Sequence, residues 1–172
     1  MTVRNQGVSD KFMSKKSIGL LIAETGIGAT ALWRMNRRFS QRLEQVHAEA
    51  NKFHDYFLLL SHWLEIKNRG GSAALYFEEM KYKRIAIYGM GELANRLFED
   101  LQGTDIEIVY GIDQEPSSCA TSIANVYSPN DELPAVDVIV VTPFSAYDNI
   151  ENLLKKTTNC PIISIENIIW SV

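Results

Sequence analysis

The residues best suited to chemistry lie in a glycine-rich turn, where Gly89, Gly91 and Ala94 form the pattern G-x-G-x-x-A. A short apolar strand is predicted over residues 83–88 before the turn, and an amphipathic helix that Gly103 ends is predicted after it. The first N–H groups of such a helix are unpaired and lie at its positive end, which favours phosphate. The turn therefore predicts an anion site, in which Gly89 permits the sharp exit from the strand and Gly91 lets a pyrophosphate approach the backbone.

An acidic residue follows the next predicted strand, residues 106–112, at Asp113. A carboxylate at the carboxyl end of the second strand can accept hydrogen bonds from the hydroxyl groups of a ribose. The same carboxylate would repel a 2′-phosphate, so NAD or another nucleotide with an unphosphorylated ribose is preferred to NADP. Glu92 argues against a phosphate at the turn and favours an empty crevice. A carboxylate at the start of the helix competes with phosphate for the same N–H groups.

The rest of the sequence continues the alternation of strands and helices. Three further strands are predicted, over residues 123–127, 136–142 and 161–165. A helix is predicted from a capping-box-like start at Ser145 and Asp148 to Lys156, and a last helical turn reaches Trp170. Right-handed crossovers then give the strand order 3-2-1-4-5. The predicted fold class is α/β, with a Rossmann-like parallel sheet of about five strands preceded by a long N-terminal helical extension.

In such a fold a ligand binds in the crevice outside the carboxyl ends of the strands. Thr142 and Pro143, at the end of the fourth strand, are expected to line this crevice opposite the turn. The predicted contacts of a nucleotide are Gly89, Met90, Gly91, Glu92, Leu93, Asp113, Gln114, Thr142 and Pro143. The predicted ligand is NAD or a nucleotide-sugar.

Three segments, residues 87–93, 110–113 and 138–142, carry a family resemblance. Through them, residues 83–169 resemble the small Rossmann-type domains of bacterial polysaccharide and nucleotide-sugar biosynthesis proteins. The resemblance implies binding of a nucleotide, a nucleotide-sugar or NAD, with Gly89, Gly91 and Asp113 as ligand contacts. It also implies a link with surface-polysaccharide metabolism, although this chain lacks the β-helix repeats and the methyltransferase half found beside similar domains.

Catalytic residues are scarce in the last two thirds of the sequence. No histidine follows His62, Tyr147 is followed four places later by Glu151 rather than by lysine, and Ser145 lies in no G-x-S-x-G motif. The favoured interpretation is a nucleotide-binding protein with little sign of its own catalytic residues, and whether it is an enzyme stays open. The alternatives are an enzyme of nucleotide-sugar metabolism, of oxidoreductase or epimerase type, and an NAD-sensing regulator.

The sequence divides into four predicted segments: a polar basic tail at 1–17, an apolar segment at 18–35, a heptad-patterned helix at 36–70 and the Rossmann-like domain at 72–172. Residues 18–33 carry Glu24 as their only charge and have basic residues on both sides, which fits a membrane-associated segment. They are short for a membrane span, and a buried or self-associating helix is the alternative. The predicted location is cytoplasmic, with the inner face of the plasma membrane as one option.

The heptad helix carries apolar residues at alternating steps of four and three: Phe39, Leu43, Val46, Ala50, Phe53, Phe57, Leu60 and Leu64. A 3.5-residue repeat of this length is typical of a coiled-coil seam, so residues 39–64 are predicted to join two or more chains. The apolar stripe widens toward Ile66, which favours the alternative that the helix docks onto its own domain.

Composition and charge limit the function classes. The chain has 172 residues, of which 46% are hydrophobic and 22% charged, so it is globular rather than disordered. Residues 1–70 carry 11 Lys and Arg against 6 Asp and Glu, whereas residues 71–172 carry 6 against 15. An acidic domain disfavours a nucleic-acid partner. No metal site is predicted, because Cys119 and Cys160 form no CxxC motif and the three histidines have no cysteine or carboxylate partners in the pattern.

Overall fold

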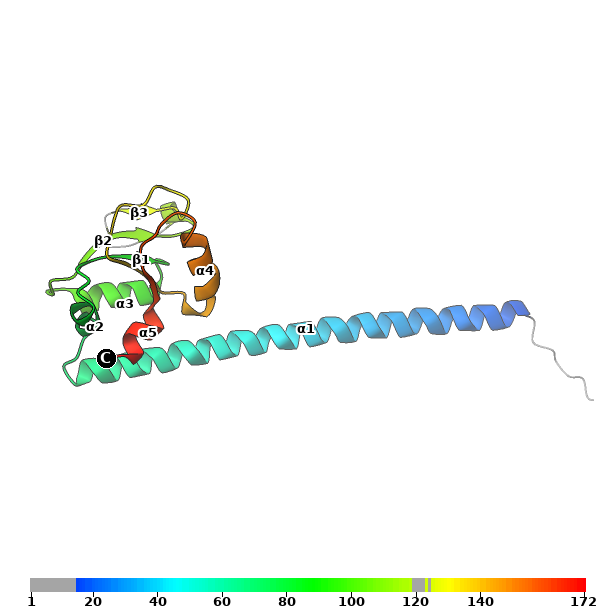
Figure 1. Cartoon of the computed structure of the whole chain (residues 1–172). Coiled ribbons are helices and arrows are strands. Elements are labelled where there is room, and N and C mark those ends of the chain that lie inside the picture. Colours follow the sequence, from blue (N-terminus) through cyan, green and yellow to red (C-terminus); the bar gives the residue numbers. More distant parts are fainter. Residues whose placement is uncertain (1–14, 119–122, 124) are drawn as a thin grey trace, which may run out of the picture. The chain divides into compact units, whose positions relative to one another are not determined.

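The computed structural model describes residues 15–118, 123 and 125–172, with the backbone alone for residues 15–32 and 118. The chain divides into two compact units, residues 1–51 and 52–172. The first unit contains most of helix α1 (Lys15–Asn68), and the second contains the end of that helix together with an α/β domain (Figure 1). Most of the predicted polar tail, and Cys119, lie outside the described residues.

The predicted apolar segment and the predicted heptad helix form one continuous helix, α1. No proline precedes Pro116 in the sequence, so no missing N–H interrupts the helix. The helix ends at Asn68, and Gly70 follows with a φ of +80°, which is the left-handed conformation that terminates helices. In the part of the chain that the structure describes, no helix is long and apolar enough to cross a membrane.

The α/β domain contains a five-stranded, all-parallel sheet. Its strands are β1 (Arg84–Tyr88), β2 (Glu107–Ile112), β3 (Val126–Tyr127), β4 (Val138–Val141) and β5 (Ile162–Ser164). Their order in space is β3-β2-β1-β4-β5, which confirms the predicted order. Strand β4 is buried along its whole length, as its continuous β-branched sequence predicts for a strand covered on both faces.

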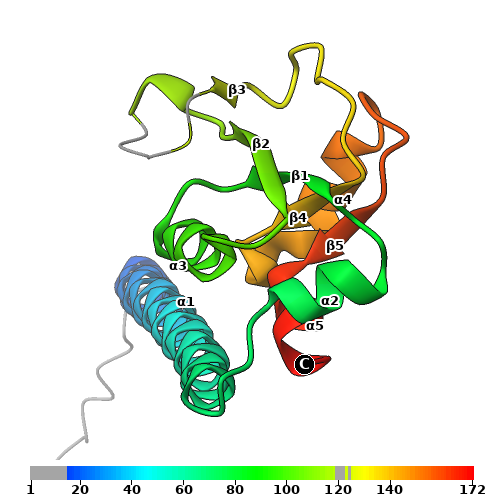
Figure 2. The ribbon, with the colours of Figure 1, turned by 90° about the vertical axis from the view of Figure 1, so that its left-hand side faces the viewer.

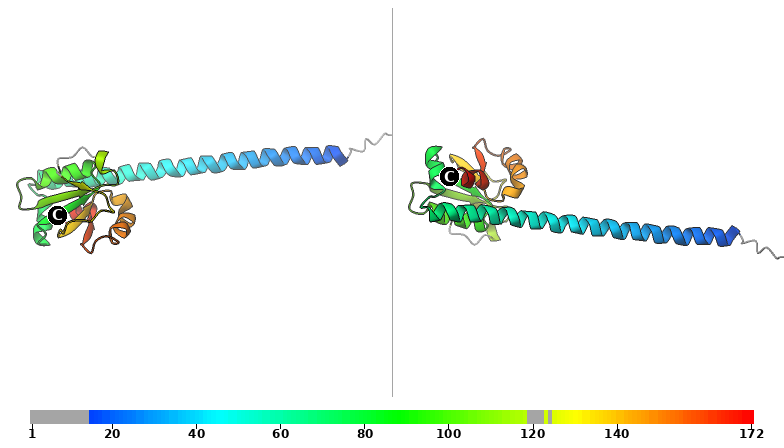
Figure 3. Two further views of the ribbon diagram at one scale, coloured as in Figure 1. Left: turned by 90° about the horizontal axis from the view of Figure 1, so that it is seen from above. Right: turned by 90° about the horizontal axis from the view of Figure 1, so that it is seen from below.

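Helices cover both faces of the sheet. They are α2 (Ala74–Glu79), α3 (Glu92–Leu101), α4 (Tyr147–Leu154) and α5 (Ile165–Trp170), with short 3-10 turns at Pro116–Ser118 and Phe144–Ala146. Helices α2, α3, α5 and the end of α1 pack on one face, and α4 packs on the other (Figures 2 and 3). The alternation of β1 divides the core accordingly, since Ile85 and Ile87 face α3 while Ala86 and Tyr88 face α4.

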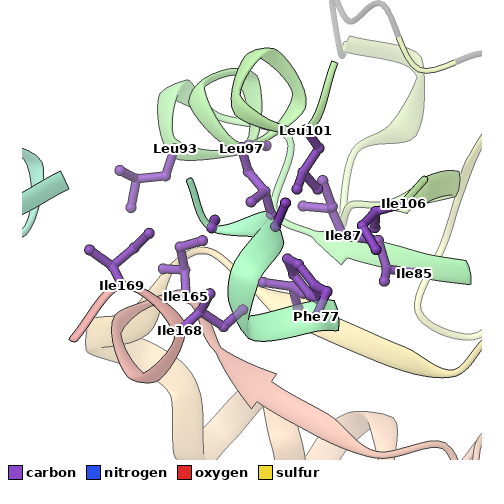
Figure 4. Close-up of a cluster of buried hydrophobic side chains, with 14 of the residues drawn as sticks. Phe77, Ile85, Ile87, Leu93, Leu97, Leu101, Ile106, Ile165, Ile168 and Ile169 are labelled. Carbon is purple, nitrogen blue, oxygen red and sulfur yellow. The ribbon is translucent and has the colours of Figure 1, made fainter. Parts of the chain in front are cut away.

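The larger core joins α3 to α5 across the first face of the sheet. In Figure 4 the leucines of α3 point toward Phe77 of α2 and toward the isoleucines of α5. The leucines are Leu93, Leu97 and Leu101, and the isoleucines are Ile165, Ile168 and Ile169. The i, i+4 spacing of the leucines on α3 places all three on one face of that helix, so the helix has a fixed position over β1.

The capping box predicted at Ser145 and Asp148 does not form. Helix α4 begins at Tyr147 after the 3-10 turn, and no side chain caps it at Ala146. The side chain of Ser145 instead hydrogen-bonds Tyr56 of α1. The prediction was wrong because a contact with a residue 89 positions away competes with the local cap. By contrast, Ser164 caps α5, since its side chain accepts a hydrogen bond from the N–H of Glu166.

A buried carboxylate fixes the end of α1 to the domain. Asp100 of α3 accepts hydrogen bonds from the indole N–H of Trp63 at 2.9 Å and from the backbone N–H of Ala73 at 2.8 Å, and it pairs with Lys67 Nζ at 2.5 Å. Burial raises the pKa of Asp100, but Lys67, Ala73 and Trp63 outweigh burial and hold it below its ordinary value. Leu59 and Ile66, on the same side of α1 as Trp63, are buried in the core.

Candidate functional site

The turn after β1 needs glycine at its first position. Gly89 has a φ of +86°, and a Cβ added there would lie 2.6 Å from the ring of Pro143 and 3.0 Å from Oγ1 of Thr142. Both the backbone conformation and the neighbouring strand end therefore exclude a side chain. The sharp exit predicted for Gly89 is what the structure shows.

At Gly91, by contrast, neither the backbone conformation nor the neighbouring described atoms require glycine. Gly91 is the N-cap residue of α3 with an ordinary φ of −92°, and a Cβ added there would meet no atom within 4 Å. Gly91 has no side chain to cap the helix, and among the described residues no side chain bonds the first N–H groups of α3. The amino end of α3 thus combines uncapped donors with open space at Gly91, which is what an approaching anion requires.

Asp113 organises the turn. It follows β2 directly, is half-buried, and accepts hydrogen bonds from the N–H of Met90 at 2.9 Å and from the N–H of Glu115 at 3.1 Å. Each carboxylate oxygen keeps accepting capacity after one such bond. The carboxylate predicted to meet a ribose therefore lies at the turn, and it also holds the residue between the two glycines in place.

Thr142 and Pro143 lie against the turn from the neighbouring strand β4. The buried hydroxyl of Thr142 lies 2.7 Å from the carbonyl oxygen of Gly89 and 3.1 Å from that of Tyr88. The two residues therefore brace the turn directly, so the predicted wall of the crevice contacts Gly89 itself. Thr142 has used its only donor on the protein backbone.

The remaining predicted contact residues differ in how far their side chains are exposed and in what they contact. Leu93 is buried in the core, so it can offer a ligand its backbone only. The side chain of Met90 lies over Gly111 of β2, where an added Cβ would come within 2.4 Å of its sulfur. Gln114 is exposed, and Glu92 is exposed with its carboxylate 2.9 Å from Arg96. Arg96 thereby draws the Glu92 charge along the helix surface and partly neutralises it.

Among the described residues, the charges around the turn are mostly acidic or already paired. Arg96 also pairs with Glu99 at 2.6 Å. Lys83 and Arg84 lie at the opposite, amino end of β1. A phosphate at this turn would therefore depend on backbone N–H groups rather than on a lysine or arginine side chain. Part of the loop after β2, residues 119–122 and 124, lies outside the described residues.

Two tyrosines and one cysteine of the domain have raised pKa values. Burial raises the pKa of Tyr110 and that of Tyr147 to about 12, and burial also raises the pKa of the Cys160 thiol. Phenol and thiol groups in this state are neither bases nor nucleophiles at neutral pH. Within the described part of the chain, no group of three or more His, Cys, Asp or Glu residues could hold a metal ion.

The burial of two polar groups was not predicted from the sequence. Asp100 lies three residues after Leu97, on the inward face of α3, and that spacing was the available signal. The hydroxyl of Tyr88, at the end of β1, is buried and has no hydrogen-bond partner among the described residues. Nothing in the local sequence of Tyr88 indicates this, because the surroundings of its hydroxyl come from distant segments.

No known protein family, no curated protein and no solved structure matches the chain.

Proposed function

We propose that the α/β domain is a Rossmann-like module that binds a nucleotide, either NAD(H) or a nucleotide-sugar, at the turn after β1. The observation that carries the proposal is the amino end of α3, where no described side chain caps the helix and the space at Gly91 is open. The Asp113 carboxylate, 2.9 Å from the N–H of Met90, supports a ribose next to the same turn. This combination of a parallel sheet, an uncapped helix and an acid after the second strand suits a ribose and a phosphate together.

The charges around the turn narrow the ligand class. Backbone N–H groups would hold the phosphates, and Asp113 would accept hydrogen bonds from the ribose hydroxyl groups. A 2′-phosphate would meet the carboxylate of Asp113 without a nearby free cation among the described residues, because Arg96 is engaged with Glu92 and Glu99. The proposal therefore favours NAD(H) and nucleotide-sugars over NADP.

We propose binding without assigning a catalytic residue. The hydroxyls of Tyr110 and Tyr147, whose pKa values burial raises to about 12, donate hydrogen bonds to the backbone carbonyl oxygens of Pro134 and Ile162. The link with surface-polysaccharide metabolism rests on the sequence resemblance of residues 83–169, and it would make a nucleotide-sugar the ligand.

A thermal-shift screen of the full chain with NAD, NADH, NADP and UDP-sugars tests the proposal. A ligand at 100 times its dissociation constant stabilises a protein by about 2.7 kcal/mol, which is easily seen as a raised melting temperature. We expect a shift with NAD(H) or a UDP-sugar and a smaller one with NADP. If none of these ligands shifts the melting temperature at millimolar concentration, the domain does not have this function.

The variant Gly91→Asp locates the site. The backbone at Gly91 has φ −92° and ψ −160°, which any residue adopts, and aspartate is a good N-cap residue. The variant should therefore be as stable as the wild type without ligand, yet its carboxylate would occupy the place of the phosphate. Asn149→Asp, which adds the same charge near the start of α4 at an exposed position, is the matched control. Loss of the ligand-induced shift in Gly91→Asp alone places the ligand at this turn, and an unchanged shift contradicts it.

A further inference from the structure

Helix α1 carries two apolar stripes, and the domain uses only one of them. Leu59, Trp63 and Ile66 are 7% exposed or less and pack in the core. The heptad seam, which runs over residues 39–64, lies beside this buried stripe. Leu60 and Leu64 each follow a buried residue by one position, which is a rotation of about 100° around the helix. The seam residues Phe53, Phe57, Leu60 and Leu64 are exposed.

The seam continues along α1 through residues that are exposed in the described part of the chain. All of residues 33–55 are exposed, including the seam residues Phe39, Leu43 and Val46. A helix in water draws most of its stability from packing of an apolar face, so this surface calls for a partner. A strict 3.5-residue repeat fits another helix of the same period, because only a supercoiled partner follows such a stripe over many turns.

The exposed surface is large enough for a stable dimer. Phe39, Phe53 and Phe57 are 61%, 75% and 66% exposed. At about 150–250 Å² per aromatic side chain, these three residues alone offer roughly 300–500 Å² in each copy. The four exposed aliphatic seam residues add to this, so two copies reach the range of about 1,200–2,000 Å² that stable interfaces bury.

The sizes of the seam residues fit an antiparallel pair. When positions whose numbers add up to 103 face each other, every aromatic residue meets an aliphatic one: Phe39 with Leu64, Leu43 with Leu60, Val46 with Phe57, and Ala50 with Phe53. The next layer outward pairs Asn36 with Lys67, so both ends of the seam close on polar residues. A parallel pair in register would instead oppose Phe to Phe in three layers and Ala to Ala in one, and cores pack best where large residues face small ones.

Charge favours the same orientation. Residues 34–42 contain four arginines and no acid, whereas residues 71–172 carry an excess of nine negative charges. The domain packs beside the carboxyl end of α1, and its helix α3 forms a groove of about 440 Å³ with α1 that Leu60, Leu64 and Glu99 help to line. In an antiparallel pair, the arginine-rich stretch of each copy runs past this end of its partner. In a parallel pair, the two arginine-rich stretches would lie side by side and repel each other.

We propose that two copies of this chain form an antiparallel coiled coil through residues 39–64 of α1. Each basic stretch then lies beside the acidic domain of the other copy. The assembly does not depend on nucleotide binding, so either proposal can fail without the other.

Light scattering on the full chain tests the dimer. The wild type should have twice the chain mass of 19.5 kDa. Phe53→Asp places a charge in the middle of the seam and should yield a monomer whose domain melts as before, because Phe53 is exposed in the single chain. Ala48→Asp, at an exposed position opposite the seam, is the matched control and should stay dimeric. A monomeric wild type, a larger assembly, or a dimer that survives Phe53→Asp overturns the proposal.

Spin-label distances test the orientation. In a chain with Cys119→Ser and Cys160→Ser, a label at Ser40→Cys should lie about 35 Å from its counterpart along an antiparallel pair. In a parallel pair the same labels would lie within about 20 Å, given an interaxial distance of about 8–10 Å. A label at Asn51→Cys, near the centre of the seam, should give a short distance in both cases and is the control. A short distance at position 40 overturns the antiparallel arrangement.

Discussion

At the scale of single residues, the turn after β1 depends on groups that are far apart in sequence. Asp113 holds the N–H of Met90, and Thr142 reaches the carbonyl oxygen of Gly89. The G-x-G-x-x-A pattern predicts the turn and the acid, because glycine positions and strand ends are local signals. It cannot predict these two bonds, since each joins side chains to backbone groups across neighbouring strands.

Asp113→Asn separates the structural role of this residue from its proposed contact with a ribose. The amide oxygen can still accept the hydrogen bond from the N–H of Met90, so the fold should survive the loss of the weaker bond from Glu115, while the negative charge at the proposed ribose contact is lost. We expect NAD-type ligands to bind more weakly by roughly 1.5–3 kcal/mol, the scale of a hydrogen bond to a charged group, and discrimination against NADP to decrease. Calorimetric titration with NAD and NADP measures both. Unchanged affinity together with unchanged preference would remove Asp113 from the site.

Tyr88→Phe tests the buried hydroxyl at the end of β1. This hydroxyl has no hydrogen-bond partner among the described residues, and an unsatisfied buried polar group costs about 1–3 kcal/mol. Removing it should leave the free energy of unfolding unchanged or raise it by about 1 kcal/mol. Urea unfolding monitored by circular dichroism gives the answer. A loss of stability would mean that the hydroxyl has a partner, such as a bound ligand or an ordered water.

At the scale of elements, alternation and crossover handedness were enough to predict the sheet order, which the structure confirms. The boundaries were less predictable. Residues 136–142 were predicted as one strand, but β4 is Val138–Val141, and Thr142 beyond its end braces the turn. The predicted start of α4 was wrong, because the side chain of Ser145 hydrogen-bonds Tyr56 instead of capping the helix.

The Asp100 cluster that joins α1 to α3 predicts a pH dependence. Because the pKa of Asp100 is lowered in the folded chain, its contribution to stability is present above the ordinary carboxyl pKa. This contribution is lost as the pH falls through the lowered value, since the unfolded chain then binds the proton more readily. Asp100→Asn should cost about 1.5–3 kcal/mol at neutral pH and should flatten the acid side of the stability profile.

Denaturant unfolding of Asp100→Asn between pH 7 and pH 3 provides the measurement. Asp105→Asn, at an exposed position just after α3, is the control and should follow the wild type. If Asp100→Asn loses stability with acid as steeply as the wild type does, the cluster does not fix the end of α1 in the way described.

At the scale of the whole molecule, α1 divides its surface between its own domain and the heptad seam. The sequence left open whether the same residues dock onto the domain or join chains, but in the structure the contacts with the domain lie on one stripe and the seam is exposed on another. Leu59 is 1% exposed in the core, whereas its neighbour Leu60 is 37% exposed in the seam. Periodicity alone could not separate the stripes, because both follow steps of four and three.

Leu59→Ala and Leu60→Ala, one position apart, should therefore have opposite effects. Leu59→Ala removes a fully buried side chain and should destabilise the domain by about 2–5 kcal/mol. Leu60→Ala should leave the unfolding of the domain nearly unchanged and weaken self-association instead. Thermal unfolding and analytical ultracentrifugation, applied to both variants, give the two readouts. Equal effects of the two variants on unfolding would contradict the division of the helix into two stripes.

The central claim is that a nucleotide binds at the turn after β1, and backbone amide chemical shifts test it most directly. With ¹⁵N-labelled protein titrated with NAD and with a UDP-sugar, the largest shift changes are expected at the amides of Gly91, Glu92 and Leu93. The amide of Met90, which bonds Asp113, should move with them. Saturable changes confined to these residues and their neighbours on β2 are the predicted result. Saturable changes elsewhere with none at the amino end of α3, or no change with either ligand, would contradict the account.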